Sequence, residues 1–142
     1  MAGSADCIFC RIAEGAVPAT IVREDEYSVA FRDLDPQAPL HVLVIPRRHI
    51  GSVNEVVDHD VSIMGALFIA ARDVAAKEGV AEDGYRLVVN TGAAANQTVQ
   101  HLHVHVLGGR DMSWPPGGER RGIDEWADRQ IARGSEHRAA RT

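Results

Sequence analysis

The sequence predicts an α+β domain with a mainly antiparallel sheet of about five strands, one long helix and a short helix near the N-terminus. Several short apolar runs have strand-like character, and one long run has helical spacing. Most successive strands are not separated by a helix, which favours antiparallel pairing. With 142 residues, 45% of them hydrophobic, the chain has enough apolar material for one core. We therefore expect residues 1–142 to form a single domain.

The first half of the chain predicts a hairpin and then a buried strand. Residues 20–23 and 27–33 read as two strands joined at the charged residues 24–26. After a proline-containing turn, Leu40–Ile45 is an almost continuous apolar run, typical of a strand buried on both faces. We expect Pro46 to end the pairing of this strand because proline has no backbone N–H to donate.

One amphipathic helix follows. Apolar residues recur every three or four positions from Val57 to Ala75, with Asp60 as the expected N-cap and Gly79 as the expected stop. This spacing predicts a helix of about 19 residues.

The second half completes the sheet. Residues 85–90 predict a strand, the small polar residues 91–97 predict a loop, and a last strand is expected to begin near Thr98. Glycines and prolines end regular structure after residue 108. We expect a short helix over 123–131 and a frayed polar tail over 134–142.

The overall charge excludes some classes of function. The formal net charge is −5, which argues against a nucleic-acid-binding surface, although a local pocket for a small anion remains compatible with it. No apolar run is long enough to span a membrane, and residues 1–6 lack the features of a signal peptide. We expect a cytoplasmic protein that binds neither nucleic acid nor membrane.

The segment His101-Leu102-His103-Val104-His105 carries the chemistry. On a strand, alternate side chains share a face, so the three imidazoles point one way while Leu102 and Val104 enter the core. Side chains on one face repeat at about 6.6 Å, so a straight strand cannot bring all three imidazoles to one small ion. The row of three imidazoles is better suited to binding an extended anion than to binding one small ion.

An imidazole is a competent nucleophile near neutral pH, and a phosphorylated imidazole stays reactive toward water. His103 is central, so we expect it to attack phosphorus through one ring nitrogen while the other donates to a fixed acceptor such as a backbone carbonyl. The flanking His101 and His105 can donate hydrogen bonds to phosphoryl oxygens or protonate the leaving group.

Cys7 and Cys10 form a Cys-x-x-Cys pair, which suggests metal ligation or redox work in a reducing compartment. Redox catalysis is the weaker alternative, since no apolar strand precedes the pair. With His49 and His101, the two cysteines would complete a Cys₂His₂ zinc site of the structural type. If His101, the first histidine of the row, binds zinc, His103 remains available as the nucleophile.

The pattern His-φ-His-φ-His-φ-φ over residues 101–107, with φ apolar, resembles the motif of the histidine triad (HIT) hydrolases and transferases. The similarity covers about residues 6–118 and leaves 119–142 as a C-terminal extension. The segments that resemble the Hint branch of this family are Asp6-Cys7-Ile8-Phe9-Cys10, Ala30-Phe31-Arg32-Asp33, Pro36-Gln37-Ala38-Pro39, His41-Val42-Leu43-Val44-Ile45-Pro46, Asn90-Thr91-Gly92, Gly108-Gly109-Arg110 and Trp114-Pro115-Pro116-Gly117.

The resemblance implies a HIT-like fold and a homodimer with a sheet continuous across the interface. It implies a pocket for a purine nucleoside monophosphate and hydrolysis of phosphoramidates of the adenylyl-amine or AMP-lysine type, with no organic cofactor. The Cys-x-x-Cys pair is similar to that of zinc-binding bacterial members. Zinc would then hold His101 as a support for His103 without acting as a Lewis acid.

The resemblance also assigns roles to residues. His103 matches the nucleophile that carries the nucleotidyl group, and Asp33 matches the carboxylate on the ribose hydroxyls. His101, His105, Thr98, Asn90 and His41 match its catalytic neighbours around the phosphate. The remaining nucleotide-binding positions implied are Ile8, Phe9, Ile12, Phe31, Leu34, Gln97, Val99 and Trp114. The Hint branch commonly has serine at the position of Thr98, and its added methyl group predicts a changed tolerance for the leaving group.

Two alternatives remain open. The first is hydrolysis or phosphorolysis of dinucleoside polyphosphates on the same histidines. The second is a zinc-stabilised nucleotide-binding module with little turnover, which the alignment of a nucleophile between two other imidazoles makes less attractive.

Overall fold

The computed structural model describes residues 6–117 and 131–133 of the chain. The chain divides into two compact units, residues 1–110 and residues 111–142, and the sheet belongs to the first. The helix expected over 123–131 lies outside the described residues except for Ile131, and the tail 134–142 lies wholly outside them. Within the described part of the chain, no helix is both long and apolar enough to cross a membrane.

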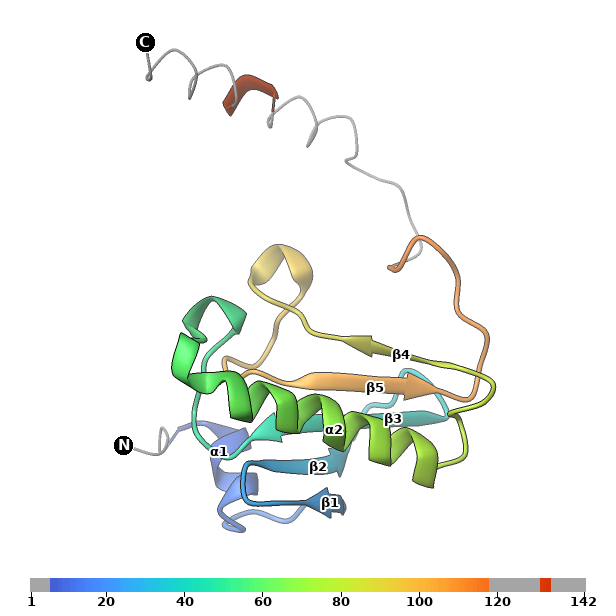
Figure 1. Ribbon diagram of the computed structural model, residues 1–142, viewed down its shortest axis with the longest axis horizontal. Helices are drawn as coiled ribbons and strands as arrows, with labels where there is room; N and C mark the ends of the chain where they lie inside the picture. Colours follow the sequence, from blue (N-terminus) through green and yellow to red (C-terminus); the bar gives the residue numbers. More distant parts are fainter. Residues whose placement is uncertain (1–5, 118–130, 134–142) are drawn as a thin grey trace. The chain divides into compact units, whose positions relative to one another are not determined.

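The first unit contains two α-helices and five strands (Figure 1). Three short 3₁₀ turns, at Val53–Glu55, Asp58–Asp60 and Ala93–Ala95, lie in the connections. The helices and strands, in chain order, are α1 (Ile8–Ala13), β1 (Ile21–Glu24), β2 (Ser28–Arg32), β3 (Leu40–Pro46), α2 (Val61–Lys77), β4 (Tyr85–Val88) and β5 (Val104–Gly108).

The five strands form one antiparallel sheet in the order β1-β2-β3-β5-β4. The α+β fold class with one long and one short helix is therefore confirmed. β3 is buried along its whole length, as its continuous apolar run predicts, because helices cover both of its faces. α2 packs across one face and α1 on the other, so the sheet is the middle of three layers (Figure 1).

Three details of the predicted elements are wrong. Pro46 lies within β3 opposite Ser28, because at a terminal position proline still offers a carbonyl to the ladder. β5 begins at Val104 rather than near Thr98, since the residues before it leave the ladder to reach other partners. α2 begins after its N-cap Asp60, as predicted, but it has 17 residues rather than about 19, because Val57 precedes the 3₁₀ turn at 58–60 and lies outside the helix.

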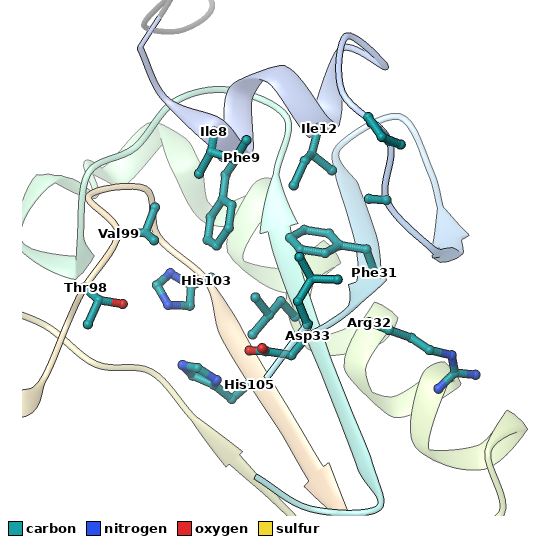
Figure 2. A pocket seen from close by; sticks show the side chains of 14 residues that line it. Ile8, Phe9, Ile12, Phe31, Arg32, Asp33, Thr98, Val99, His103 and His105 are labelled. Atoms are coloured by element: carbon teal, nitrogen blue, oxygen red, sulfur yellow. The ribbon is translucent and has the colours of Figure 1, made fainter. Parts of the chain in front are cut away.

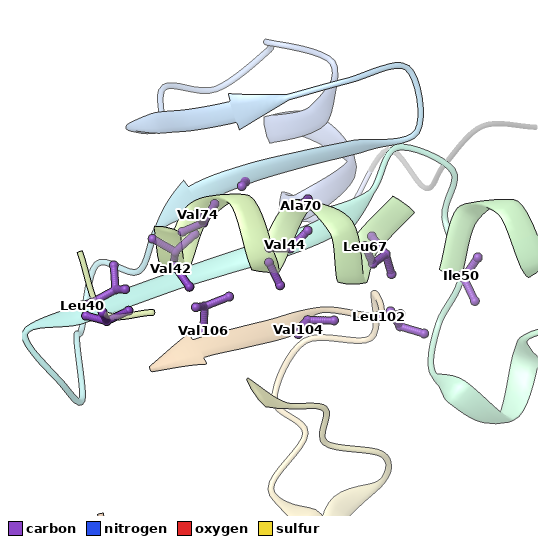
Figure 3. Close-up of a cluster of buried hydrophobic side chains, with 14 residues drawn as sticks. Leu40, Val42, Val44, Ile50, Leu67, Ala70, Val74, Leu102, Val104 and Val106 are labelled. Atoms are coloured by element: carbon purple, nitrogen blue, oxygen red, sulfur yellow. The ribbon is translucent and has the colours of Figure 1, made fainter. Parts of the chain in front are cut away.

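The larger apolar core lies between α2 and the sheet (Figure 3). Val42 and Val44 of β3 and Val104 and Val106 of β5 point to this face, and all four are at most 1% exposed. Leu67 from α2 packs onto them and is 1% exposed. At about 25 cal/mol per Å² of buried apolar surface, each such side chain contributes roughly 1.5–3 kcal/mol. This face is dry and carries the stability of the unit.

A smaller apolar cluster lies on the opposite face, beneath α1. Phe9 of α1 packs edge-on against Phe31 of β2, with ring centroids 5.4 Å apart, above Leu43 and Ile45 of β3. The six residues of α1 cover only part of this face. The uncovered part is where the histidines lie.

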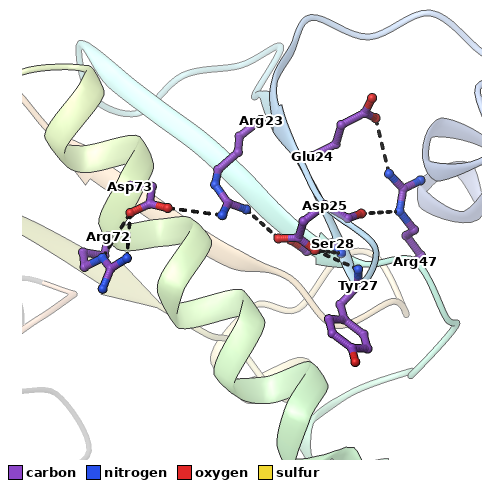
Figure 4. A network of polar contacts seen from close by, with 8 residues as sticks. All are labelled: Arg23, Glu24, Asp25, Tyr27, Ser28, Arg47, Arg72 and Asp73. Atoms are coloured by element: carbon purple, nitrogen blue, oxygen red, sulfur yellow. Dashed lines mark hydrogen bonds and ion pairs between the residues drawn. The ribbon is translucent and has the colours of Figure 1, made fainter.

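A polar network holds the β1–β2 hairpin in place (Figure 4). The Asp25 carboxylate accepts hydrogen bonds from the backbone N–H groups of Tyr27 and Ser28, each at 2.7 Å, and from Arg23 at 2.5 Å. Burial raises the pKa of Asp25, but these donors, with Arg23 the strongest, bring its pKa below the usual value. Arg47, which follows β3, donates to the backbone oxygens of Asp25 and Ala13 and so ties the hairpin to α1.

Candidate functional site

Strand alternation brings two histidines to the face that α1 leaves open. Leu40, Val42 and Val44 of β3 enter the main core, so His41 points to the opposite face. In the same way His105 of β5 lies opposite Leu43, two residue pairs along the ladder from His41. The predicted alternation of histidines and core residues therefore holds, although only His105 lies in a regular strand.

His103 lies just before β5 and is 5% exposed. Its Nδ1 atom is 2.7 Å from the backbone oxygen of His101. A carbonyl oxygen can only accept, so Nδ1 carries the proton and Nε2 keeps its lone pair. The ring packs edge-on against Phe9 and His105, with centroid distances of 5.2 and 4.9 Å. Its orientation is thus fixed by one hydrogen bond and two aromatic contacts.

A chain of hydrogen bonds orients His105. The backbone N–H of Gln37 donates to Nδ1 of His41 at 3.0 Å, so the proton of neutral His41 lies on Nε2. That atom is 2.9 Å from Nδ1 of His105, which therefore accepts and leaves the His105 proton on Nε2. His105 consequently presents an N–H donor beside the lone pair of His103.

Asp33 follows β2 and stands beside this pair, with its Oδ2 atom 3.4 Å from Nε2 of His41. Asp33, His41 and His105 together have the composition of a two-histidine, one-carboxylate metal site. The hydrogen bond from Gln37 opposes that reading, because it keeps the proton of neutral His41 on the nitrogen that would bind the ion. The arrangement fits a hydrogen-bonded chain better than a metal centre.

Burial favours the neutral forms of His105 and His41. It lowers the pKa of His105 to about 4, and positive charge on His103 and His41 would lower it further, while Asp33 acts in the opposite direction. Burial also lowers the pKa of His41, against the carboxylates of Asp33 and Asp35. At neutral pH His105 is therefore a hydrogen-bond donor without a charge.

A cavity of about 280 Å³ opens over the histidines (Figure 2). Phe9 and Phe31 lie toward one end, Thr98 and Val99 on one side and Asp33 on the other. Ten of the residues predicted to bind the nucleotide line it: Ile8, Phe9, Ile12, Phe31, Asp33, Leu34, Thr98, Val99, His103 and His105. It thus combines an apolar slot with a polar end that carries two imidazoles and a carboxylate.

Three other predicted residues of the first unit, Asn90, His41 and Gln97, lie outside the cavity wall. Asn90 is half-buried beyond β4, and His41 stands behind His105. Gln97 is buried, and its amide bonds Gly92, Gly51 and the oxygen of Val99, so it holds loops together rather than facing a ligand. Trp114 is 83% exposed and belongs to the unit 111–142.

Four lining residues were not predicted from the sequence: Pro18, Ala19, Leu43 and Arg32. Leu43 could have been predicted, because alternation along β3 places it on the same face as His41. Pro18 and Ala19 lie in a connection whose path no pattern reveals. Arg32 follows Phe31 on β2, so its side chain points to the α2 face, where it pairs with Glu78 at 2.5 Å.

Cys7, Cys10, His49 and His101 form a second cluster, beside the cavity, with their ligand atoms all within 4.8 Å of one another. The Cys7 Sγ–His101 Nδ1, Cys10 Sγ–His49 Nδ1 and His49 Nδ1–His101 Nδ1 distances are 3.3, 3.2 and 3.2 Å. A tetrahedral zinc ion separates such ligand atoms by about 3.3–3.8 Å. The donor set and its spacing therefore fit zinc.

The surroundings of His101 also suit a metal ligand. Its Nε2 atom donates to the backbone oxygen of Pro46 at 2.9 Å, which leaves the Nδ1 lone pair directed at the cluster. The ring is fully buried, and burial lowers its pKa to about 4, so it stays neutral as ligation requires. One residue thus serves two sites, with its side chain in the cluster and its carbonyl on His103.

Comparison with known proteins gives consistent matches. The family model for the HIT domain matches residues 14–112. An uncharacterised HIT-like protein of Synechococcus elongatus is 49% identical over 114 residues, which are 80% of this chain and 99% of that protein. A HIT family hydrolase from Legionella pneumophila has a similar crystal structure, with a TM-score of 0.77 and 50% identity over 79% of this chain and all of its own.

A zinc-bound histidine triad family protein from Mycobacterium smegmatis is also similar in structure. Its TM-score is 0.66 at 29% identity, over 95% of this chain and 99% of that one. The match to the family model covers most of the first unit, including the histidine segment and every cavity-lining residue except Ile8, Phe9 and Ile12. By these matches and by its fold, the chain belongs to the HIT domain family.

Proposed function

We propose that this protein hydrolyses purine nucleoside phosphoramidates, of the adenylyl-amine or AMP-lysine type, through a nucleotidyl intermediate on His103. The observation that carries the proposal is the hydrogen bond from His103 Nδ1 to the backbone oxygen of His101, which leaves Nε2 as a nucleophile at the cavity. The structural neighbours that are described as HIT family hydrolases support hydrolytic chemistry. We assign the chain to the Hint-like branch.

The cavity suits a nucleoside monophosphate. A planar base fits between the apolar residues of α1 and Val99, with Phe31 at the inner end. The two carboxylate oxygens of Asp33 suit the 2′- and 3′-hydroxyls of a ribose. The phosphate then lies against His103, His105 and the hydroxyl of Thr98 at the polar end.

The first step transfers the nucleotidyl group to the protein. The His103 Nε2 lone pair forms a bond to phosphorus, and the P–N bond to the amine breaks, with its electron pair going to the leaving nitrogen. That nitrogen takes a proton from solvent and departs as the amine. The Nδ1–H to carbonyl bond strengthens as the ring becomes cationic, so it favours the intermediate.

The second step releases the nucleotide. A water oxygen bonds to phosphorus, the P–N bond to His103 breaks, the ring recovers its lone pair and the water proton returns to solvent. In both steps His105 Nε2–H donates to a phosphoryl oxygen, and its pKa of about 4 keeps it neutral for that task at pH 5–8. His41 acts through His105 as a positioning residue.

We propose that Cys7, Cys10, His49 and His101 hold a structural zinc ion of the kind seen in bacterial members. Four protein ligands fill a tetrahedral shell, so the ion would supply cross-linking of the N-terminal segment to the histidine segment. The zinc-bound neighbour from Mycobacterium smegmatis supports this assignment.

We also propose a homodimer with the sheet continued across the interface. β4 is an edge strand of the sheet, which leaves one side of it able to pair with a second copy. Val61 and Phe68, which lie on one side of α2, are 73% and 57% exposed, an arrangement that a partner subunit would cover. Sedimentation of Phe68→Glu should show a monomer, whereas Ile21→Glu at the opposite edge should leave the dimer intact.

The test of the activity uses adenosine 5′-phosphoramidates of simple amines and of lysine. The wild type should release AMP, and His103→Ala should not. His59→Ala is a matched control, because His59 is an exposed histidine in the 3₁₀ turn before α2. Rapid quenching should trap the wild type with one added nucleotidyl group, and peptide mapping should place that group on His103.

Parallel assays with diadenosine polyphosphates separate the alternatives. Faster cleavage of these than of phosphoramidates would identify a dinucleoside polyphosphate hydrolase. Tight AMP binding with negligible turnover of both substrate types would identify a nucleotide-binding module and overturn the proposal. We expect the cytoplasm as the place of action.

A further inference from the structure

The metal cluster is connected to the nucleophile through one residue. The imidazole of His101 belongs to the cluster, and the backbone oxygen of the same residue accepts the proton of His103 Nδ1 at 2.7 Å. The Nε2 of His101 is anchored to Pro46 at 2.9 Å. Fixing the His101 side chain at both nitrogens therefore fixes the carbonyl that orients His103.

A second connection runs through α1. Cys7 is the N-cap of this helix, where its Sγ accepts from the backbone N–H of Cys10 at 3.4 Å, and Cys10 lies in its first turn. The same six-residue helix supplies the apolar side chains of one cavity wall. Phe9, between the two cysteines, contacts both His101 and His103, with centroid distances of 5.9 and 5.2 Å. The two thiols therefore position the slot for the base.

A third connection begins at His49. Two residues later the oxygen of Gly51 accepts from the Gln97 amide at 2.8 Å, and the same amide nitrogen donates to the oxygen of Val99 at 3.0 Å. Between them, the oxygen of Ile50 accepts from the backbone N–H of Leu102 at 2.6 Å. The opposite cavity wall, at Thr98 and Val99, is thus tied to the segment that carries the third ligand.

The cluster is also accessible to solvent. An open groove of about 420 Å³ reaches it, and the residues lining this groove are Asp6, Cys7, Ile8, His49, Thr98, Val99 and Gln100. Cys7 and His49 are only half-buried, whereas Cys10 and His101 are buried. An ion in the cluster therefore has a path to and from solvent that avoids the protein core.

The fold does not depend on the cluster for its main stability. The larger core lies on the opposite face of the sheet, under α2. α1 keeps its contacts with Phe31, Leu43 and Ile45 and the hydrogen bond from Arg47 to Ala13 whether or not the cysteines are ligated. Loss of the ion should loosen the cavity while the sheet stays folded.

We propose that Cys7, Cys10, His49 and His101 form an exchangeable zinc site whose occupancy sets the affinity of the neighbouring cavity for nucleotide and the order of His103. The role of His103 rests on the proposed function, but the effect on nucleotide binding does not. Thermodynamic linkage makes any coupling between two binding sites reciprocal, so AMP should raise the affinity for zinc by the same factor as zinc raises the affinity for AMP.

The test compares the full-length protein loaded with zinc, stripped by a chelator and reloaded. The stripped protein should keep a cooperative thermal transition and bind AMP about tenfold more weakly by calorimetry, an effect typical of lost support around a ligand. The His103 Nδ1–H resonance should be resolved in the loaded protein and broadened by solvent exchange in the stripped one. Reloading should restore both.

Two variants sharpen the test. His49→Ala removes a ligand that lies neither on α1 nor on the histidine segment, and it should have the weak AMP affinity of the stripped protein at any zinc concentration. Val74→Ala lowers stability from the opposite face, where Val74 is 1% exposed, and should keep the full response to zinc.

Equal AMP affinity within about twofold in the loaded and stripped proteins would overturn the proposal. Unfolding of the sheet on removal of zinc would also overturn it, because zinc would then support the whole fold rather than the cavity alone. If AMP affinity depends on zinc but no phosphoramidate is cleaved, the coupling stands and the proposed function fails.

Discussion

The two faces of the sheet consist of alternate residues of the same strands, but one face forms the main apolar core and the other carries the candidate site. Toward α2, β3 and β5 present only aliphatic residues, and that face is closed and dry. Toward α1, the alternate residues of the same strands include His41 and His105, and that face is partly open. A shift of one residue in register would exchange the two sets, so the pairing that makes the core also makes the site.

The α2 face of the sheet therefore contributes mainly to stability, and the α1 face carries the residues of the candidate site. The short α1 adds little buried surface, and the polar groups on its side satisfy one another through hydrogen bonds. Substitutions on one face should therefore change stability with little effect on turnover, and those on the other should do the opposite. Four predictions test this division, from the largest effect to the smallest.

The largest effect is expected for His103→Ala on the open face. Removing the nucleophile should lower kcat/KM for a phosphoramidate at least about 1000-fold. The free energy of unfolding should fall by at most about 2 kcal/mol, because one hydrogen bond and two edge-on ring contacts are lost. Steady-state kinetics and urea unfolding of the same preparation measure both, and a large loss of stability would contradict the division.

The converse effect is expected for Leu67→Ala on the closed face. Leu67 is 1% exposed beneath α2, so its truncation should cost about 2–5 kcal/mol in unfolding free energy. Well below the melting temperature, kcat/KM should stay within about twofold of wild type. A tenfold fall in kcat for this variant would mean that the core and the site are coupled.

A smaller effect is expected for His41→Ala, which removes the donor that orients His105. We expect kcat to fall about 10- to 100-fold with little change in KM, because His41 does not line the cavity. His41→Gln, whose amide can still donate, should recover part of the loss. If KM rises and kcat is unchanged, His41 supports binding instead of the orientation of His105.

The smallest effect is the dependence of stability on pH. The pKa of His105 is about 4 in the folded protein, below the ordinary value of 6.5, so the unfolded chain takes up its proton first as the pH falls. This contribution to stability is complete above pH 6.5 and is lost between pH 6.5 and about 4. At pH 5.5 the loss is roughly 1 kcal/mol.

Urea unfolding at several pH values, with zinc held saturating, measures this slope. His105→Asn, which cannot titrate in this range, should have a shallower dependence than the wild type. An identical slope in the two proteins would show that other groups cause the acid destabilisation.

Much of the fold could be predicted because its signals are local. The continuous apolar run of Leu40–Ile45 and the helical spacing after Asp60 show which side chains need to be buried, and in the structure these side chains are buried in β3 and α2. The start of β5 could not be predicted, because the residues before it bond to segments distant in sequence: His101 bonds to Pro46, and the backbone N–H of Leu102 bonds to Ile50. The pairing of Pro46 depends likewise on a ladder position that no local pattern specifies.

The residues of the candidate site also fall into two groups, those that a sequence pattern predicts and those that it does not. The histidine pattern and the Cys-x-x-Cys pair mark chemistry that few residue types perform, so these residues stand out in the sequence. The role of Gln97, predicted as a nucleotide-binding position, could not be read from the sequence, because an amide can bond to a loop, as it does here, or to a ligand equally well. Pro18 and Ala19 reach the cavity through the path of a connection, which depends on the whole fold.

The acceptor for His103 is a main-chain carbonyl, and that has a consequence for how the gene can vary. Every amino acid carries this carbonyl, so no substitution at position 101 deletes it. A substitution there would therefore remove a proposed zinc ligand and, with it, the proposed support for the order of His103. The acceptor that selects the Nδ1–H tautomer of His103 would remain, so such a variant should have reduced rather than abolished activity.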